Sequence, residues 1–135
     1  MNMIRMLLRS AWLYHVGAIV LTYVFWWSGL NKVFDFAGAQ AEMSHFGLEP
    51  PAFFALATIV VQLGGSALII IGSRWAWLGA GALAAFTLGT IPIAHRYWAM
   101  VGTVAFLEQS LVQEHITVIG GLILAAILAE VRRKA

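Results

Sequence analysis

The sequence predicts an all-α membrane protein: a bundle of four transmembrane helices with a short amphipathic interfacial helix between the first and second spans. Hydrophobic residues make up 61% of the 135-residue chain and charged residues only 10%, too few to cover a soluble globule of this size. The charged residues are also spaced so that uncharged stretches of membrane-spanning length lie between them. We therefore expect a single membrane domain over residues 1–135.

Three of the spans follow from the distances between charged residues. A helix needs about 20 apolar residues to cross the hydrocarbon core of a bilayer. Uncharged stretches of 22, 24 and 21 residues begin after Arg9, Glu49 and Arg74, and each is long enough for one helix. The predicted spans are residues 11–31, 52–73 and 75–95.

The fourth span, at about residues 111–131, is less regular. Only 15 uncharged residues separate Glu114 from Glu130, which corresponds to about 22 Å of helix. Glu130 stands beside the basic segment at 132–134, which belongs at a membrane interface. We therefore expect Glu114 to be buried and paired with a cation, because an unpaired carboxylate within a membrane is costly. The expected partners are Lys32, Arg96 or a protonated His95.

Basic residues are distributed unevenly between the two ends of these spans. Cytoplasmic flanks of membrane proteins carry an excess of lysine and arginine. Six basic residues fall on the side of the chain termini and two on the other, so we expect both termini in the cytoplasm. The six are Arg5, Arg9, Arg74, Arg132, Arg133 and Lys134, and the two are Lys32 and Arg96.

Small residues recur every four positions on the third and fourth spans, and such faces let helix backbones approach closely. The sequence leaves open whether these faces pack within the bundle or against a second copy of the chain. The two sets are Gly81, Ala85 and Gly89, and Gly121, Ala125 and Ala129.

An amphipathic segment connects the first two spans, with its apolar residues at helical spacing. Gly47 suits the position just after a helix, and prolines at 50–51 favour a restart of the chain before the second span. Two interpretations remain open: a connection that lies on the membrane surface, or a lid over the mouth of the bundle. The apolar set is Phe36, Ala39, Met43 and Phe46.

Polar residues gather where the bundle is expected to open outward. Asp35 follows Lys32 at a spacing that allows an ion pair. An imidazole beside a carboxylate can donate and accept the protons of a quinone/quinol couple, whereas the alternative is a network that only satisfies helix ends. The residues expected at this mouth are Asn31, Lys32, His95, Arg96, Glu114 and His115.

The second span carries a polar face of Thr58, Gln62 and Ser66, spaced by four residues. A polar face within hydrocarbon is expected to point inward. For Thr58 and Ser66 we expect hydrogen bonds between helices. Gln62 stays open between such a bond and a contact with a quinone carbonyl or headgroup, because an amide has several hydrogen-bonding positions to satisfy.

A series of motifs resembles the DoxX family of small bacterial membrane proteins. The first span ends in G-x-x-K, followed by D-F-x-G and an amphipathic stretch that closes with F-G-L-x-P. "QLGGSALIIIG", "AHRYW" and "ITVIGGLILAAI" then follow in the order typical of the family. The resemblance covers about residues 16–129, and it implies a four-span protein of the bacterial inner (plasma) membrane.

The resemblance also implies a functional context and a set of polar positions. The family is named after a subunit of an archaeal quinol oxidase and thiosulfate:quinone oxidoreductase, and other members are linked to redox systems. Gln62 stands where the family offers a glutamate, and Glu114 stands where it offers a lysine. The family's polar positions fall on Lys32, Gln62, His95 and Glu114 of this sequence.

We therefore expect an accessory or quinone-associated subunit of a membrane oxidoreductase; the alternatives are a non-enzymatic binder or carrier of a small hydrophobic molecule, or a structural membrane partner protein. The sequence does not decide whether the chain is an enzyme or a homo-oligomer. It has no cysteine, which excludes disulfides and thiolate metal sites, and no metal site is expected. Its basic residues form no stripe suited to nucleic acid. A haem between His95 and His115 is disfavoured because no second signature supports it.

Overall fold

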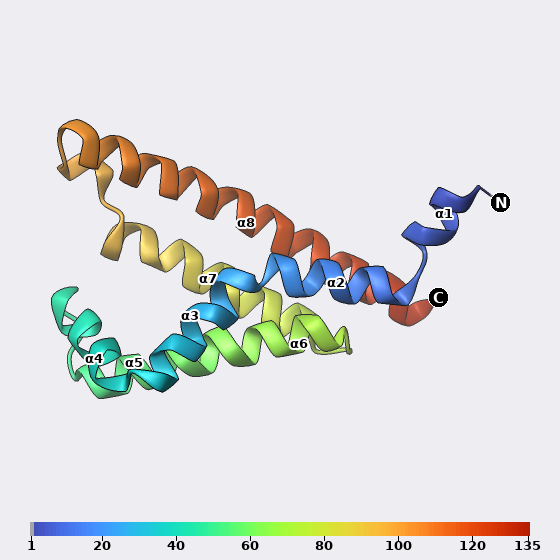
Figure 1. The fold of residues 1–135 in the computed structure, drawn as a ribbon, viewed down its shortest axis with the longest axis horizontal. Coiled ribbons are helices and arrows are strands. Elements are labelled where there is room, and N and C mark those ends of the chain that lie inside the picture. Colours follow the sequence, from blue (N-terminus) through green and yellow to red (C-terminus); the bar gives the residue numbers. More distant parts are fainter. Residues whose placement is uncertain (1) are drawn as a thin grey trace.

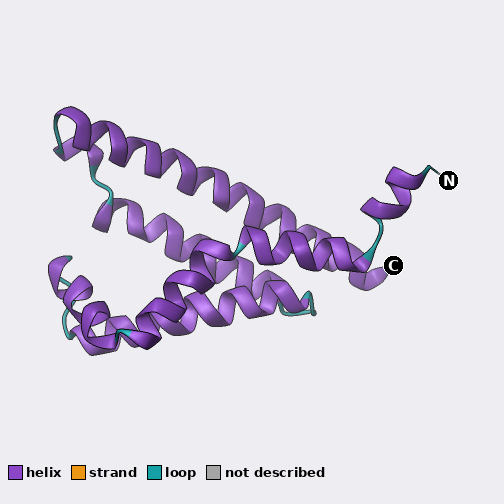
Figure 2. Cartoon of the chain, in the orientation of Figure 1, coloured by secondary structure: helices purple, strands orange, loops and turns teal. Residues whose placement is uncertain are grey.

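The computed structural model describes residues 2–135, and over this range every regular element is a helix (Figures 1 and 2). The elements are α1 (Met3–Leu8), α2 (Ala11–Leu21), α3 (Tyr23–Phe34), α4 (Phe36–His45), α5 (Pro51–Ile59), the π-helix η1 (Val60–Gly64), α6 (Gly65–Ile71), α7 (Ala76–Ala94), the short 3₁₀-helix η2 (Tyr97–Ala99) and α8 (Gly102–Lys134).

Within the described residues, three helical stretches are long and apolar enough to cross a membrane. They are Pro51–Ile71, formed by α5, η1 and α6; Ala76–Ala99; and Gly102–Lys134. The pair α2 and α3 makes a fourth span when it is counted as one broken helix, and its two parts are bent by 57°. The chain is therefore an all-α membrane protein, as the sequence predicts.

The break in the first span was not foreseen, because the sequence predicts one continuous helix over residues 11–31. The structure interrupts it at Thr22, whose hydroxyl donates to the carbonyl of Ala18 at 2.7 Å, a bond that bends helices. The indole of Trp26 donates to the carbonyl of Ile19 at 3.1 Å, in the turn where the helix is interrupted. No proline or glycine marks this position, so only the tertiary structure shows it.

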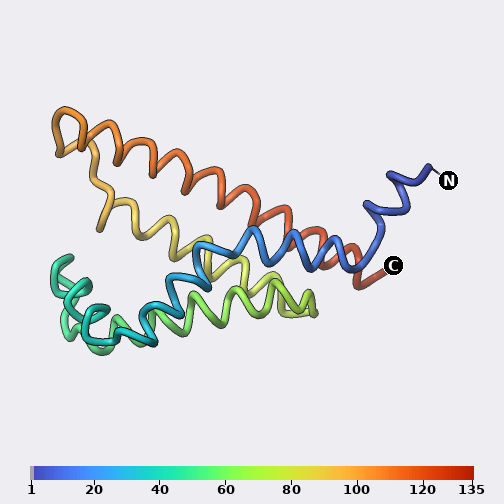
Figure 3. The backbone as a smooth tube through the Cα atoms, viewed as in Figure 1, coloured from blue at the N-terminus to red at the C-terminus, as the bar shows by residue number. Residues whose placement is uncertain are grey.

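The two ends of the bundle differ, and we name them by their contents. The terminal half holds both chain ends and the α6–α7 turn, and the lid half holds α4 and η2 (Figure 3). In the terminal half, α2, α6, α7 and α8 pack around one apolar core. The buried members of that core are Tyr14, Ala18, Phe25, Ile69, Ala76, Ala80, Leu83, Leu122 and Ala129.

The closest approach of α6 and α7 lies at Gly65 and Gly79. A Cβ atom at Gly79 would stand 2.6 Å from the carbonyl oxygen of Gly65. The glycines of the stripe predicted on the third span do not pack within the bundle, because a Cβ atom at Gly81 or Gly89 would meet nothing within 4 Å; packing of this stripe against a second copy of the chain stays a prediction. Several faces of this helix carry small residues, and spacing alone does not say which one packs.

The stripe predicted on the fourth span does pack within the bundle. A Cβ atom at Gly121 would stand 2.8 Å from Leu21, and Ala125 and Ala129 belong to the apolar core. In this helix the small face coincides with the face turned toward α2, so the spacing gave the correct answer.

Helix α4 ends as its sequence predicts, and the structure shows how it begins. Asp35 caps its first turn by accepting a hydrogen bond from the amide of Gly38 at 2.9 Å. At the other end Gly47 has φ +74°, and the amide of Leu48 donates back to the carbonyl of Met43 at 2.9 Å. The apolar side of α4 packs against α5 through Ala39, Met43 and Ala55, which fixes α4 beside the bundle.

Candidate functional site

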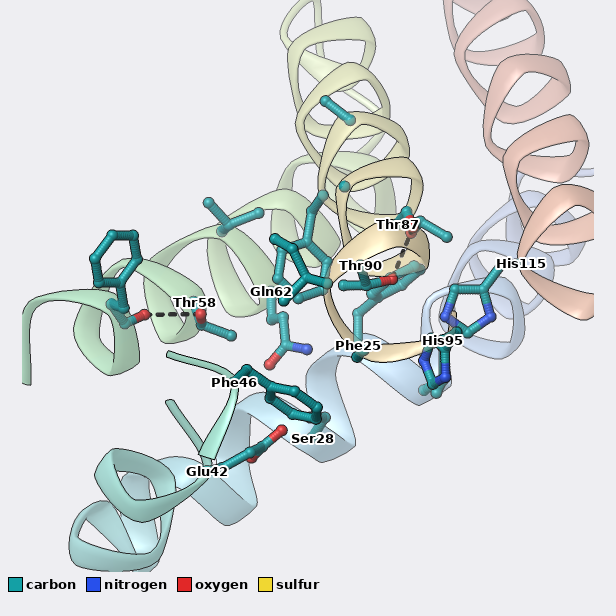
Figure 4. A pocket seen from close by; sticks show the side chains of 18 of the residues that line it. Phe25, Ser28, Glu42, Phe46, Thr58, Gln62, Thr87, Thr90, His95 and His115 are labelled. Atoms are coloured by element: carbon teal, nitrogen blue, oxygen red, sulfur yellow. Dashed lines mark hydrogen bonds between the residues drawn. The ribbon is translucent and has the colours of Figure 1, made fainter. Parts of the chain in front are cut away.

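A cavity of about 660 Å³ lies in the lid half, among α3, α4, α5, η1, α7 and α8. Pockets of this size are typical of sites for small organic ligands. Much of its wall is aromatic and aliphatic, and Figure 4 shows side chains from several helices directed into it. Apolar members of the wall include Phe25, Phe46, Phe54, Val61, Phe86 and Leu111.

Helix α4 forms one wall of this cavity, because Glu42, Met43 and Phe46 all line it. The structure therefore supports the interpretation of the connecting segment as a lid. The lid is held by Lys32 of α3, whose Nζ lies 3.1 Å from Glu42 Oε2 and donates to Ser28 Oγ at 3.1 Å. The sequence-based pairing of Lys32 with Asp35 is wrong, because Asp35 is used as the cap of α4.

Gln62 occupies the centre of the π-helix η1, a local geometry that often marks functional positions. Its side chain lines the cavity, and the residue is only 5% exposed. In Figure 4 the amide lies near Phe46 of the lid. Its Oε1 atom accepts no hydrogen bond from any of residues 2–135. Through this oxygen Gln62 thus makes no bond between helices within residues 2–135.

Three hydroxyl groups near Gln62 donate to carbonyls of their own helical segment. Thr58 donates to the carbonyl of Phe54 at 2.7 Å, and Thr87 donates to that of Leu83 at 2.7 Å. Ser66 donates to the backbone carbonyl of Gln62 itself at 2.6 Å, so the hydrogen bond between helices expected for Ser66 is absent within the described part of the chain. Thr58 does make the expected contact between helices, because its hydroxyl also lies 4.0 Å from the Sδ atom of Met43 on α4.

Two histidines lie together where α7 ends against α8. Pro92 stands in the last turn of α7, which ends at Ala94 and leaves His95 as its cap. The Nδ1 atom of His95 lies 2.6 Å from Glu108 Oε2. The His115 ring meets the His95 ring edge-on, with centroids 4.8 Å apart.

The partners of these imidazoles define which nitrogen remains free. His115 Nδ1 lies 2.7 Å from the carbonyl of Leu111, which can only accept, and His95 Nδ1 faces a carboxylate. Each Nδ1 therefore carries the proton, and each neutral ring keeps its Nε2 lone pair as an acceptor. Both residues line the cavity.

Five of the seven candidate site residues line this one cavity, and two do not. Asn31 and Arg96 are exposed and lie outside the wall. Asn31 adjoins Lys32 in sequence but projects about 100° away from it around α3. The five that line the cavity are Lys32, Gln62, His95, Glu114 and His115.

The expectation that Glu114 is buried and paired is wrong. Glu114 is exposed at the cavity wall and forms no ion pair with any of residues 2–135. The expected cations have other partners, since Lys32 binds Glu42 and His95 binds Glu108. Helix α8 is 33 residues long, about 50 Å, and exceeds the roughly 30 Å hydrocarbon core. Charge spacing inside such a helix does not fix its depth.

Sequence reasoning missed Glu42 and Glu108 as functional candidates. Each pairs with a residue ten or more positions away in the chain, on a different helix. Ion-pair spacing rules apply within one helix and give no signal for such pairs. No group of three or more histidine and acidic side chains among residues 2–135 is placed to hold a metal ion.

Comparison with known proteins gives one family and one curated relative. The model of the DoxX family matches residues 13–96. Inner membrane protein YphA of Escherichia coli (strain K12) is 28% identical over 110 residues, which cover 82% of this chain and 76% of that protein. No solved structure matches the chain. The family match includes Lys32, Gln62 and His95 but ends before Glu108, Glu114 and His115.

Proposed function

From the premise that this chain belongs to the DoxX family of inner-membrane proteins, we propose that it is a quinone-associated accessory subunit of a membrane oxidoreductase. The observation that carries the proposal is the cavity in the lid half, which combines an apolar wall with polar groups from several helices. A quinone has the matching chemistry, because its apolar ring carries oxygen atoms at two opposite positions.

The polar groups of the cavity suit the proton exchange of a quinone/quinol couple. Two protons accompany the two electrons of this couple, so a site that binds both forms needs groups that accept and donate protons. His95 and His115 each present an Nε2 lone pair, and an imidazole can both accept and donate a proton. Glu108 orients the His95 ring through the 2.6 Å contact.

The accessory role follows from the chemistry that the chain lacks. It contains no cysteine, so it has no thiol relay with which to pass electrons to a bound quinone. We propose that a partner subunit supplies the electrons. Haem stays outside the proposal, because His95 and His115 are in direct ring contact and leave no space for iron and porphyrin between them.

A non-enzymatic binder or carrier of another small hydrophobic molecule is the second candidate. The apolar wall favours it, since aromatic and aliphatic side chains accept many ligands of suitable size. The two candidates differ in the identity of the bound molecule and in its dependence on the polar groups. A purely structural role in a membrane complex would show no bound molecule.

The test is purification from native membranes in nanodiscs, with mass spectrometry of bound small molecules and proteins. We expect quinone and an oxidoreductase subunit with the wild type. His95→Ala and Lys32→Met should each lower the retained quinone and hydroquinone together roughly tenfold, the effect of one lost hydrogen bond in the cavity. His15→Ala is the matched control, because this histidine bonds the Ile70 carbonyl outside the cavity.

Three results would change the assignment. A different molecule that depends on the same residues would support the carrier. No bound molecule in the wild type would leave the structural role. Equal quinone in all variants would place quinone outside the cavity and contradict the proposal.

We further propose that both termini face the cytoplasm, on the positive-inside rule. Both chain ends lie at the same end of the bundle, which agrees with an even number of spans (Figure 3). Reporters fused after Arg74 and Ala135 should report the cytoplasm, and reporters within 42–49 or 100–108 should report the other side. A C-terminal reporter outside the cytoplasm would contradict this topology.

A further inference from the structure

The amide of Gln62 has a buried oxygen atom that the protein leaves without a hydrogen bond. The residue is 5% exposed, and none of residues 2–135 donates to its Oε1. Burying a carbonyl oxygen without a donor is unfavourable, and proteins rarely retain such a group without a function for it. The group also lines the cavity, where a bound molecule can reach it.

None of the donors among residues 2–135 bonds this oxygen atom. The hydroxyls of Thr58, Thr87 and Thr90 each donate to a carbonyl of their own helix. The amine of Lys32 donates to Ser28 Oγ and pairs with Glu42. A bound molecule can therefore supply the donor that Gln62 Oε1 lacks.

The backbone around Gln62 is held closely against α3, so the residue has little freedom to move away. A Cβ atom at Gly29 would lie 2.8 Å from Leu63 Cδ2 and 3.3 Å from the Cβ atom of Gln62. This close approach fixes η1 on α3, and the carbonyl of Gln62 is bonded by Ser66. The backbone that carries the unbonded oxygen is thus held in place.

The other free groups of the cavity also accept hydrogen bonds. His95 and His115 each keep an Nε2 lone pair, and Glu114 presents a carboxylate with no ion pair among residues 2–135. These acceptors come from α7 and α8, whereas Gln62 comes from η1. A ligand that satisfies both sides has to donate hydrogen bonds from two positions.

We propose that the cavity binds a hydroquinone in preference to the corresponding quinone, and that Gln62 is the residue that sets this preference. This inference rests on the proposed function, because it takes the quinone/quinol class from there. A hydroquinone carries two O–H donors, one for Gln62 Oε1 and one for an acceptor on α7 or α8. A quinone carries only acceptor oxygens, so it cannot supply the donor that Gln62 Oε1 lacks.

The experiment compares a short-chain benzoquinone with its hydroquinone, binding each to the full chain in nanodiscs under anaerobic conditions. The wild type should bind the hydroquinone roughly tenfold more tightly, as expected for one buried hydrogen bond. Gln62→Leu should lose the preference by weakening hydroquinone binding alone. Gln113→Leu is the matched control and should keep it, because Gln113 is exposed on α8 and does not line the cavity.

The outcomes separate this inference from the proposed function. If the wild type binds both forms equally, or if Gln62→Leu keeps the preference, this inference is overturned and the quinone site stands. If neither form binds, the proposed function fails as well. The wild-type ratio decides the question even if the variant misfolds, and thermal unfolding of ligand-free Gln62→Leu is expected to match or exceed that of the wild type, since leucine removes the unbonded amide.

Discussion

The terminal half and the lid half use polar groups in different ways. In the terminal half the buried phenol of Tyr14 of α2 donates to the carbonyl of Ile69 of α6 at 2.8 Å, and the cavity beside it is small, about 220 Å³. In the lid half the hydroxyls turn back on their own helices, Gln62 Oε1 has no donor within residues 2–135, and a cavity remains.

This difference indicates that the two halves have different tasks. Close backbone contacts such as Gly65–Gly79 bring many atoms together and stabilise the fold. A cavity with polar groups in its wall is less stable than a core packed with apolar side chains. Proteins usually retain such a cavity because it binds a ligand. The terminal half is therefore the scaffold, and the lid half is the site that it supports.

The largest effect on stability is expected from Gly79→Ala. The new Cβ atom would lie 2.6 Å from the backbone carbonyl of Gly65, which has no side-chain freedom with which to move away. We expect the free energy of unfolding in detergent to fall by about 2–3 kcal/mol. Gly81→Ala, two residues along the same helix, meets nothing within 4 Å and should be neutral or slightly stabilising. Equal losses in the two variants would contradict the packing described here.

Tyr14→Phe should have an intermediate effect. It removes one hydrogen bond between α2 and α6 and leaves the neighbouring bond of His15 to the Ile70 carbonyl in place, so the free energy of unfolding should fall by about 1 kcal/mol. Tyr23→Phe is the control, because Tyr23 is exposed and its hydroxyl bonds none of residues 2–135. Quinone retention should be unchanged in both variants, and its loss in Tyr14→Phe would mean that the halves are not separate in function.

Glu42→Gln should have the smallest effect on stability. It breaks the ion pair with Lys32, but Glu42 is half-exposed, and such pairs contribute a few tenths of a kcal/mol. The effect should be concentrated in the lid: relative to the wild type, amide hydrogen exchange should become faster in α4 and stay the same in α7. Glu49→Gln, beyond the end of α4, should leave this exchange unchanged. If the amides of α4 exchange as slowly in Glu42→Gln as in the wild type, the ion pair does not hold the lid.

Much of the fold could be predicted because it depends on local chemistry. The spans α5–α6 and α7 begin and end within two residues of the ranges taken from charge spacing. The end of α4 at Gly47 follows from the freedom of glycine at positive φ. The bend at Thr22 could not be predicted. Its cause is a pair of hydrogen bonds from Thr22 and Trp26, and threonine and tryptophan at other positions can make such bonds too, so the residue types alone do not mark a bend.

The site was predicted only in part, namely where it depends on local chemistry. Lys32, Gln62 and His95 are polar residues within apolar spans, and such residues are expected to face the interior. Their partners Glu42 and Glu108 lie on other helices, so the pairing depends on the way those helices cross. The false prediction for Glu114 came from the assumption that α8 is only as long as the membrane is thick.

The central claim is that the lid half binds the ligand while the terminal half does not, and photolabelling tests it most directly. An azido-substituted benzoquinone, irradiated with the protein in nanodiscs and mapped by mass spectrometry, should label the segments around Gln62 and His95. Excess unlabelled hydroquinone should prevent that labelling and leave any labelling of α2 unaffected. Labelling spread over the lipid-facing surfaces of both halves, with no protection by excess ligand, would contradict the claim.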